Sequence, residues 1–232
     1  MIHLKANAYG HADPQLYETP ELATLALIDV DPWLRTEGQP RLILEPACGP
    51  GAIAGVMGYA GHKVRASDLH YYGERWKGKA WTPRDPAWMM PEWHKDFFDW
   101  TPNAVRLWVG DSARYQGCTA LVTNPPYGAD EHRASRAEAF ALHALELVPR
   151  VYMLLEATFF QAGGTRRAEL FDRGHLTGFF PFADRLDMHR DGFPEEDKQT
   201  QSRRHAWFRW QRGAGCTRPE VRRLCAATGR GL

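Results

Sequence analysis

The sequence predicts an α/β fold, with a mostly parallel sheet covered by helices on both faces. Short apolar runs typical of buried strands alternate along the chain with segments whose apolar residues recur at helical spacing. The first of these strands runs into a glycine-containing turn and a helix, as in folds that bind ligands at strand ends. At 232 residues, of which 44% are hydrophobic and 12% aromatic, the chain fits one domain covering 1–232.

The first elements expected are a helix and a strand–helix–strand unit. Thr19 is a favourable N-cap and Pro20 suits the first helical position, so a helix is predicted to begin there. A buried strand over 41–45 follows, then a helix that ends at Gly61. A second strand is predicted over 63–68.

The regular pattern breaks between residues 70 and 104, which are rich in Trp, Pro and charged residues. We interpret this segment as an insertion. It contains five Lys or Arg and five Asp or Glu, so its charge does not indicate a groove for nucleic acid. Its aromatic residues either form a small core of their own or stack on unpaired bases.

The second half of the chain continues the alternation of strands and helices. The last two strands have no long helix between them and are expected to be antiparallel neighbours. A basic tail over about 211–232 either contacts phosphate or is a solvated chain end. The predicted strands are 107–109, 119–123, 151–157, 176–182 and 206–210, and the predicted helices are 137–148 and 165–172.

The first motif is Glu45-Pro46-Ala47-Cys48-Gly49-Pro50-Gly51, followed by Asp68 at the end of the next strand. The glycines allow a sharp turn and the close approach of a ligand, and a carboxylate at Asp68 can accept hydrogen bonds from ribose hydroxyls. The motif therefore predicts a nucleoside site.

The identity of the nucleoside depends on the residues around the glycines. The turn also satisfies the dinucleotide pattern G-x-G-x-x-A, so an NAD-dependent oxidoreductase is one alternative. However, Glu45 would repel a pyrophosphate and suits the cationic amino group of S-adenosylmethionine. Pro46 and Pro50 remove two N–H groups that a phosphate site would use. The sequence favours S-adenosylmethionine as cofactor.

The second motif, Asn124-Pro125-Pro126-Tyr127, directly follows an apolar strand. The Asn124 side-chain oxygen and the Pro125 carbonyl can each accept one N–H of a planar amine and direct its lone pair. The prolines restrict the backbone between these acceptors, and Tyr127 offers a ring on which a flipped base can stack. Transfer of a group to an exocyclic amine is the chemistry that this motif predicts.

These motifs resemble those of the class I methyltransferases that modify N6 of adenine. The resemblance spans about 15–212 and includes Tyr17-Glu18-Thr19-Pro20, the two motifs above, and the ending Ala206-Trp207-Phe208-Arg209-Trp210, which is similar to small phage-type members. It implies a Rossmann-like sheet of seven strands whose last strand is antiparallel.

The resemblance also implies the roles of individual residues. Thr19 and Pro20 would flank the methionine end of the cofactor, and an acidic residue after the third strand would contact its adenine. Asp111 is our first choice for that residue; Asp96 has a similar Asp-Phe context but lies farther from Asn124. The predicted cofactor-binding residues are Tyr17, Thr19, Pro20, Glu45, Pro46, Ala47, Gly49, Gly51, Asp68, Leu69, Asp111 and Asn124, and the predicted catalytic residues are Asn124, Pro125, Pro126 and Tyr127.

The function expected is methylation of adenine N6 in nucleic acid, with DNA favoured over RNA. The same motif serves N4-cytosine and protein-glutamine methylation, and a silent nucleic-acid-binding module is the alternative outside the enzymes. Without a separate recognition domain, sequence specificity would be weak or supplied by a protein partner. The oligomeric state stays open.

The four cysteines form no C-x-x-C pair or zinc spacing, so we expect no metal site and a reduced cytoplasmic chain. No long apolar stretch predicts a membrane span.

Overall fold

A central sheet carries helices on both of its faces in the computed structural model, which describes residues 16–35, 39–73, 91–109, 119–126, 136–161, 164, 167–188, 204–225 and 227–231. The strands are β1 (Leu42–Glu45), β2 (Lys63–Asp68), β3 (Glu92–Trp93), β4 (Thr119–Thr123), β5 (Arg150–Glu156), β6 (Leu176–Pro181), β7 (His205–Gln211), β8 (Glu220–Val221), β9 (Leu224–Cys225) and β10 (Arg230–Gly231). The α-helices are α1 (Glu21–Val30), α2 (Ala52–Tyr59), α3 (Pro102–Val109) and α4 (Arg136–Leu147). Three further turns of helix are the 3₁₀ segments η4 (Phe97–Asp99) and η6 (Ala157–Phe160) and the π-helical η7 (Arg167–Asp172).

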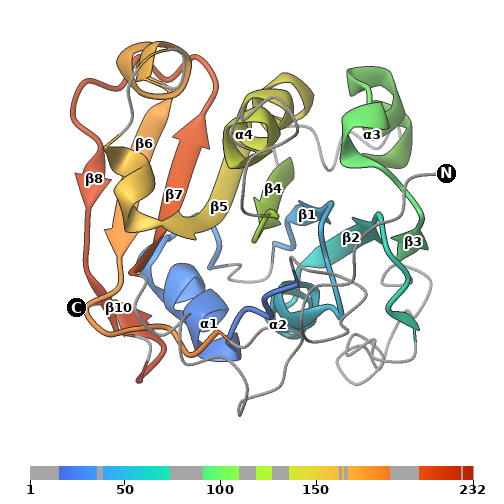
Figure 1. Cartoon of the computed structure of the whole chain (residues 1–232), viewed down its shortest axis with the longest axis horizontal. Helices are drawn as coiled ribbons and strands as arrows, with labels where there is room; N and C mark the ends of the chain where they lie inside the picture. The colour runs from blue at the N-terminus through green and yellow to red at the C-terminus, as the bar shows by residue number, and fades with distance from the viewer. Residues whose placement is uncertain are drawn as a thin grey trace, which may run out of the picture.

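Within the described residues the sheet has eight strands in the order β3-β2-β1-β4-β5-β7-β6-β8 (Figure 1). Strands β2, β1, β4 and β5 are parallel neighbours, whereas β7 is antiparallel to both β5 and β6. The α/β class, the mostly parallel sheet and the antiparallel pairing of the last two predicted strands are therefore confirmed. The eighth strand, β8, extends the expected sheet at one edge.

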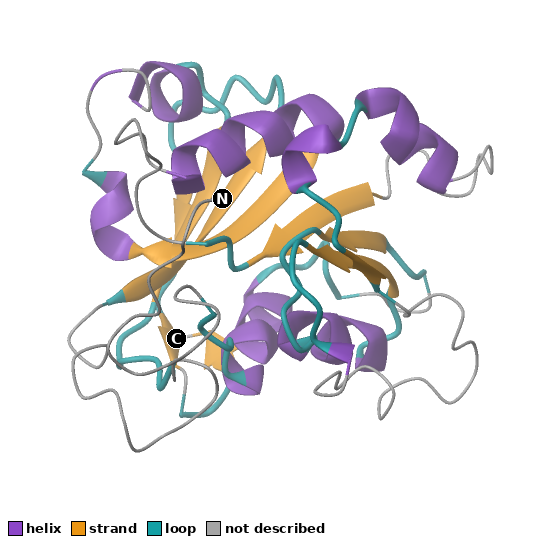
Figure 2. Cartoon of the chain, turned by 45° about the vertical axis from the view of Figure 1, so that its right-hand side comes forward, coloured by secondary structure: helices purple, strands orange, loops and turns teal. Residues whose placement is uncertain are grey.

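Helices α1 and α2 cover one face of the sheet, and α3 and α4 cover the other (Figure 2). Successive side chains of β1 serve the two faces in turn: Ile43 packs with α1 and α2, while Leu42 and Leu44 pack with α4. All four residues of β1 are buried, as expected for a strand covered on both sides. No helix in the described part of the chain is long and apolar enough to cross a bilayer.

The expected strand at 107–109 is wrong, because these residues end helix α3. Thr101 begins this helix: its hydroxyl accepts a hydrogen bond from the N–H of Ala104 at 3.1 Å, and Pro102 takes the first helical position. The strand next to β2 is instead β3, which lies inside the segment interpreted as an insertion. Its two residues pair Glu92 with Ser67 and Trp93 with Asp68.

The segment interpreted as a basic tail folds back onto the molecule where the structure describes it. Strand β8 pairs with β6, and β9 pairs with β10 in a small antiparallel sheet. The N–H of Gly231 donates to Asp29 of α1 at 2.9 Å, and an added Cβ at Gly229 would lie 3.2 Å from Leu22 of the same helix. The chain end thus covers the outer side of α1.

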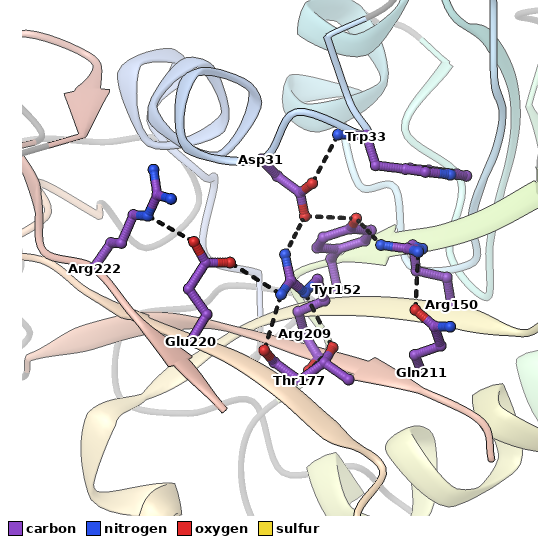
Figure 3. Close-up of polar contacts among 9 residues, drawn as sticks. All are labelled: Asp31, Trp33, Arg150, Tyr152, Thr177, Arg209, Gln211, Glu220 and Arg222. Atoms are coloured by element: carbon purple, nitrogen blue, oxygen red, sulfur yellow. Dashed lines mark hydrogen bonds and ion pairs between the residues drawn. The ribbon is translucent and has the colours of Figure 1, made fainter. Parts of the chain in front are cut away.

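A buried polar cluster joins α1, β7 and β8 (Figure 3). Arg209 of β7 donates to Asp31 at 2.9 Å and to Glu220 of β8 at 3.1 Å. The Tyr152 hydroxyl donates to the same Asp31 oxygen at 2.8 Å, and Thr177 accepts from Arg209 at 3.0 Å. Because Tyr152 is near the start of β5, this cluster lies at the edge of the sheet opposite the carboxyl ends of the parallel strands.

Candidate active site

The carboxyl ends of β2, β1 and β4 bring the predicted functional residues to one edge of the sheet. Glu45 is level with Ala66 and Leu44 with Leu121, so Asp68 and Asn124 extend just beyond Glu45 on either side. Side-chain alternation along the strands directs Glu45, Asp68 and Asn124 to the face that carries α1 and α2. Open α/β sheets bind their ligands at this kind of edge.

The glycine turn, residues 46–51, connects β1 to α2. Its backbone has positive φ at Gly49 (50°) and Gly51 (90°), a conformation that favours glycine. The N–H of Cys48 donates to the carbonyl of Ser67 at 3.0 Å, which holds the turn against β2. A Cβ added to Gly49 would lie 2.9 Å from the side chain of Leu16, so the segment before α1 passes close to the turn.

Asp68 lies at the end of β2, as predicted, and its side chain also organises the turn. Its two carboxylate oxygens accept the N–H groups of Gly49 at 2.8 Å and His70 at 2.9 Å. A carboxylate offers about four acceptor positions, so one side chain can hold a turn and also accept from a ligand's hydroxyls. The residue is 8% exposed. The next residue, Leu69, is 51% exposed and presents an apolar side chain beside the strand end.

Glu45 is a buried carboxyl group with an unusual environment. It is 1% exposed, and its Oε2 has no hydrogen-bond partner. Burial raises the pKa of Glu45 well above its usual value; the N–H of Ala54 opposes this effect, and the charge of Asp68 adds to it. A buried carboxyl group with one unpartnered oxygen is costly on its own, and a bound cation would stabilise its charged form.

Asn124 follows β4 and is held by the segment before α1. Its Nδ2 donates to the carbonyl of Tyr17 at 3.0 Å and to the hydroxyl of Thr19 at 3.1 Å. The prediction that Thr19 is the N-cap of α1 is wrong. Pro20 takes that position, and no side chain caps the helix. Pro125 is buried and Pro126 partly buried, while Tyr127 lies outside the described residues.

The acidic residue after the third strand is Asp96. The N–H of Lys95 donates to the carbonyl of Asp68 at 3.0 Å, which brings the loop after β3 next to β2. Asp96 then caps η4, accepting from the N–H of Phe98 at 2.9 Å. Asp111 lies outside the described residues. The strand expected before it, at 107–109, is the end of helix α3. Asp96, the alternative that the Asp-Phe pattern suggested, therefore follows the strand next to β2, and its contact with the cofactor adenine stays a prediction.

An aromatic cluster flanks Asp68, formed by β3 and the loops after β2 and β3. The Tyr71 ring lies 5.5 Å from the ring of Trp93 and 6.5 Å from that of His94, and Tyr71 is 58% exposed. His94 has a positive φ of 58°, which is uncommon outside glycine. The sequence indicated that this region is aromatic, but the pairing of rings across two loops has no local signal.

The described residues fit a cationic nucleoside. Glu45 supplies a buried carboxyl group with one unpartnered oxygen, and the glycine turn allows close backbone approach. Asp68, at the end of β2, and Asp96, in the loop after β3, supply acceptors. A pyrophosphate is repelled by a carboxylate, whereas a cationic amino group is attracted to it. Glu45, buried beside the glycine turn, therefore favours S-adenosylmethionine over a dinucleotide.

Comparisons with known proteins show which solved structures have a similar fold. Neither the protein-family models nor the curated proteins give a match to this sequence. Solved structures do. The methyltransferase subunit of a type I restriction-modification system from Streptococcus thermophilus gives a TM-score of 0.60 at 12% identity, covering 95% of this chain and 51% of that chain. The chain therefore shares the fold of this methyltransferase subunit.

Two further structures agree with this fold. A protein from Vibrio vulnificus assigned as the modification subunit of a type I restriction enzyme gives a TM-score of 0.59 at 11% identity, covering 92% of this chain and 48% of that chain. A Listeria monocytogenes protein assigned as a class I S-adenosylmethionine-dependent methyltransferase gives 0.57 at 13% identity, covering 89% and 65%. The chain thus spans about half the length of the two restriction-modification subunits.

Proposed function

We propose that this protein transfers a methyl group from S-adenosylmethionine to N6 of adenine in nucleic acid, with DNA favoured over RNA. The observation that carries the proposal is the placement of Asn124 and Pro125 at the same sheet edge as Glu45 and Asp68. This edge thus combines a site for a cationic nucleoside with two acceptors for a planar amine.

In this proposal each of several described residues binds a different part of the cofactor. Glu45 accepts the methionine ammonium, and the glycine turn allows the backbone to approach. Asp68 binds the ribose hydroxyls, and Asp96 receives the adenine amine. The bound cofactor supplies an electrophilic methyl group on a sulfonium. Leu69, exposed beside Asp68, offers an apolar contact for the adenine ring.

Asn124 and Pro125 act on the target. The Asn124 Oδ1 and the Pro125 carbonyl accept the two N–H groups of the exocyclic amine, whose lone pair is delocalised into its ring. These hydrogen bonds would increase the electron density at nitrogen and stabilise the positive charge that develops on it as the N–C bond forms and the bond between the methyl group and sulfur breaks. The cofactor would leave as the neutral thioether, and the amine would lose its extra proton to water. Holding the amine in this geometry also removes the entropy cost of bringing it into line. Tyr127 provides the stacking surface in this mechanism.

The choice of nucleic acid rests on two further supports. The exposed aromatic cluster around Tyr71 and Trp93 flanks the proposed cofactor site and suits stacking on unpaired bases. Two structures of the same fold are assigned as subunits of type I restriction-modification systems. Because the chain spans only about half of those subunits, we propose that a protein partner or a further segment supplies target recognition.

Mass spectrometry of the product tests this proposal. Duplex DNA, single-stranded DNA, RNA and bulk protein are each incubated with the enzyme and a methyl-deuterated cofactor, then digested to nucleosides or amino acids. We expect deuterated N6-methyladenine, and transfer lowered by on the order of 100-fold in Asn124→Ala. Asn103→Ala, an exposed asparagine on α3, serves as the control. Label found only in N4-methylcytosine or only in protein glutamine would overturn the adenine assignment.

A further inference from the structure

The orientation of the Asn124 side chain is set by residues 105 and 107 positions away in the sequence. Its Nδ2 donates to the Tyr17 carbonyl at 3.0 Å and to the Thr19 hydroxyl at 3.1 Å. An amide nitrogen carries two hydrogens, so these two bonds use both of them. Since the carboxamide group is planar, fixing its nitrogen in two directions also fixes the direction of Oδ1.

The two acceptors have different effects on this amide. The Tyr17 carbonyl can only accept, so it favours the rotamer in which nitrogen rather than oxygen faces the segment before α1. A hydroxyl can accept or donate and does not distinguish the two ends of the amide. The second bond, to Thr19, instead fixes the rotation of the amide plane about its last torsion, which is broad when no partner is present.

The Thr19 hydroxyl has no structural role in its own helix. The N-cap of α1 is Pro20, and no side chain caps this helix. Thr19 is 5% exposed, so a hydrogen bond that it makes there is protected from water. Thr24 offers a contrast, because it is a fully buried threonine within α1 whose hydroxyl has no partner.

We propose that Thr19 is a positioning residue for methyl transfer, one that acts through Asn124. This inference rests on the proposed function: Thr19 holds the amide plane of Asn124 so that Oδ1 accepts from the exocyclic amine. If the plane rotates, the acceptor leaves the line of the N–H and the stabilisation of the developing charge decreases. The role differs from the cofactor contact that the sequence resemblance implied for this residue.

The test uses Thr19→Val, which keeps the shape of the side chain and removes the hydroxyl, with Thr19→Ser as the conservative variant. Single-turnover rates are measured at saturating cofactor, and cofactor affinity is measured separately by calorimetry. We expect Thr19→Val to lower the transfer rate about 10-fold, the effect of losing one hydrogen bond, with cofactor affinity unchanged. Thr19→Ser should restore the rate to within about 3-fold of the original, and Thr24→Val should leave it unchanged.

The same Thr19→Val change in the Asn124→Ala variant tests whether the hydroxyl acts through Asn124. In Asn124→Ala, the additional change Thr19→Val should cause no further loss of rate, because the hydroxyl then has nothing to position. A full additional 10-fold loss would overturn the proposal. So would a Thr19→Val protein that binds cofactor weakly and transfers normally once saturated, since the hydroxyl would then serve the cofactor.

The hydrogen bond itself is tested without activity, so that failure of the proposed function is recognised separately. The side-chain NH₂ resonances of Asn124 are assigned by their loss in Asn124→Ala, and their exchange with water is compared in both Thr19 variants. We expect faster exchange in Thr19→Val than in Thr19→Ser. If no acceptor is methylated but the exchange changes as expected, the proposed function fails while the contact stands. Unchanged exchange in Thr19→Val overturns the inference in either case.

Discussion

Glu45 is the residue whose environment says most about the proposed cofactor site. Its carboxyl group is buried at the end of β1, with one oxygen lacking a partner. Burial raises its pKa well above the usual value, so near neutral pH the side chain holds its proton more readily than an exposed glutamate does. A cation bound beside it reverses this effect by favouring the charged form.

Binding of S-adenosylmethionine is therefore predicted to release a proton from Glu45. The pKa is raised in the structure and lowered by the ligand's ammonium, so affinity should increase with pH until the raised pKa is passed, by at most about tenfold per pH unit. Calorimetric titrations in two buffers of different ionisation enthalpy measure the number of protons released. Glu45→Gln should remove this release, and an equal release in wild type and variant would show that another group loses the proton.

Some residues of the site can be predicted from their local sequence, and others cannot. Glu45, Asp68 and Asn124 were predicted from positions at strand ends, and the structure brings all three to one sheet edge. Thr19 was misread because a threonine before Pro20 is a typical N-cap signal, whereas its actual partner is 105 residues away. Such a partner leaves no trace in the local pattern.

At the scale of elements, the sequence identified every strand of the central parallel sheet except β3. This strand has two residues, Glu92 and Trp93, and a pair of residues cannot show alternation. The apolar run at 107–109 was taken for a strand, although Thr101-Pro102 carries the same helix-start signal that had been recognised at Thr19-Pro20. Consistent use of that signal would have predicted α3 and removed the strand after which Asp111 was chosen.

His62 connects the segment after α1 to the residue before β1 and makes their packing sensitive to pH. Its Nε2 lies 3.0 Å from the carbonyl of Leu34, after α1, and its Nδ1 accepts from the N–H of Arg41, before β1, at 3.3 Å. The ring is therefore neutral, with the proton on Nε2. Burial lowers the pKa of His62 from 6.5 to about 4, and the charge of Arg41 contributes.

The free energy of unfolding is predicted to fall as the pH is lowered from about 6.5 to about 4. The unfolded chain binds a proton at His62 in this window and the folded chain does not, so this residue contributes up to about 3 kcal/mol that is fully present above pH 6.5. Urea unfolding across this range should show a shallower pH dependence in His62→Gln. His175→Gln is the control, because His175 accepts a backbone N–H but is only partly buried. Identical slopes in His62→Gln and wild type would contradict the assignment.

At the scale of the whole molecule, the buried polar cluster around Arg209, shown in Figure 3, connects the sheet, α1 and β8. Its Arg209 and Asp31 side chains are 12% and 2% exposed, whereas Arg222, at its rim, is 52% exposed. Removing one partner of a buried ion pair leaves the other charge uncompensated, and an exposed pair contributes little.

Arg209→Ala is predicted to destabilise the protein by about 3–5 kcal/mol, and Arg222→Ala by at most about 1 kcal/mol. Denaturant unfolding of the two variants measures the difference. Because the cluster lies at the edge opposite the proposed active site, cofactor affinity should be unchanged in whatever fraction of Arg209→Ala is folded. Equal, small losses in both variants would show that β8 and α1 are held by apolar packing alone.

The central claim is that the carboxyl edge of this sheet binds S-adenosylmethionine, and calorimetric titration with S-adenosylmethionine and with NAD tests it most directly. The account predicts that the former binds and the latter does not. It also predicts that Asp68→Ala weakens binding by about 1.5–3 kcal/mol, the range for hydrogen bonds to a charged group, while Asp172→Ala, at an exposed position, has no effect. Binding of NAD in place of S-adenosylmethionine, or unchanged affinity in folded Asp68→Ala, would contradict it.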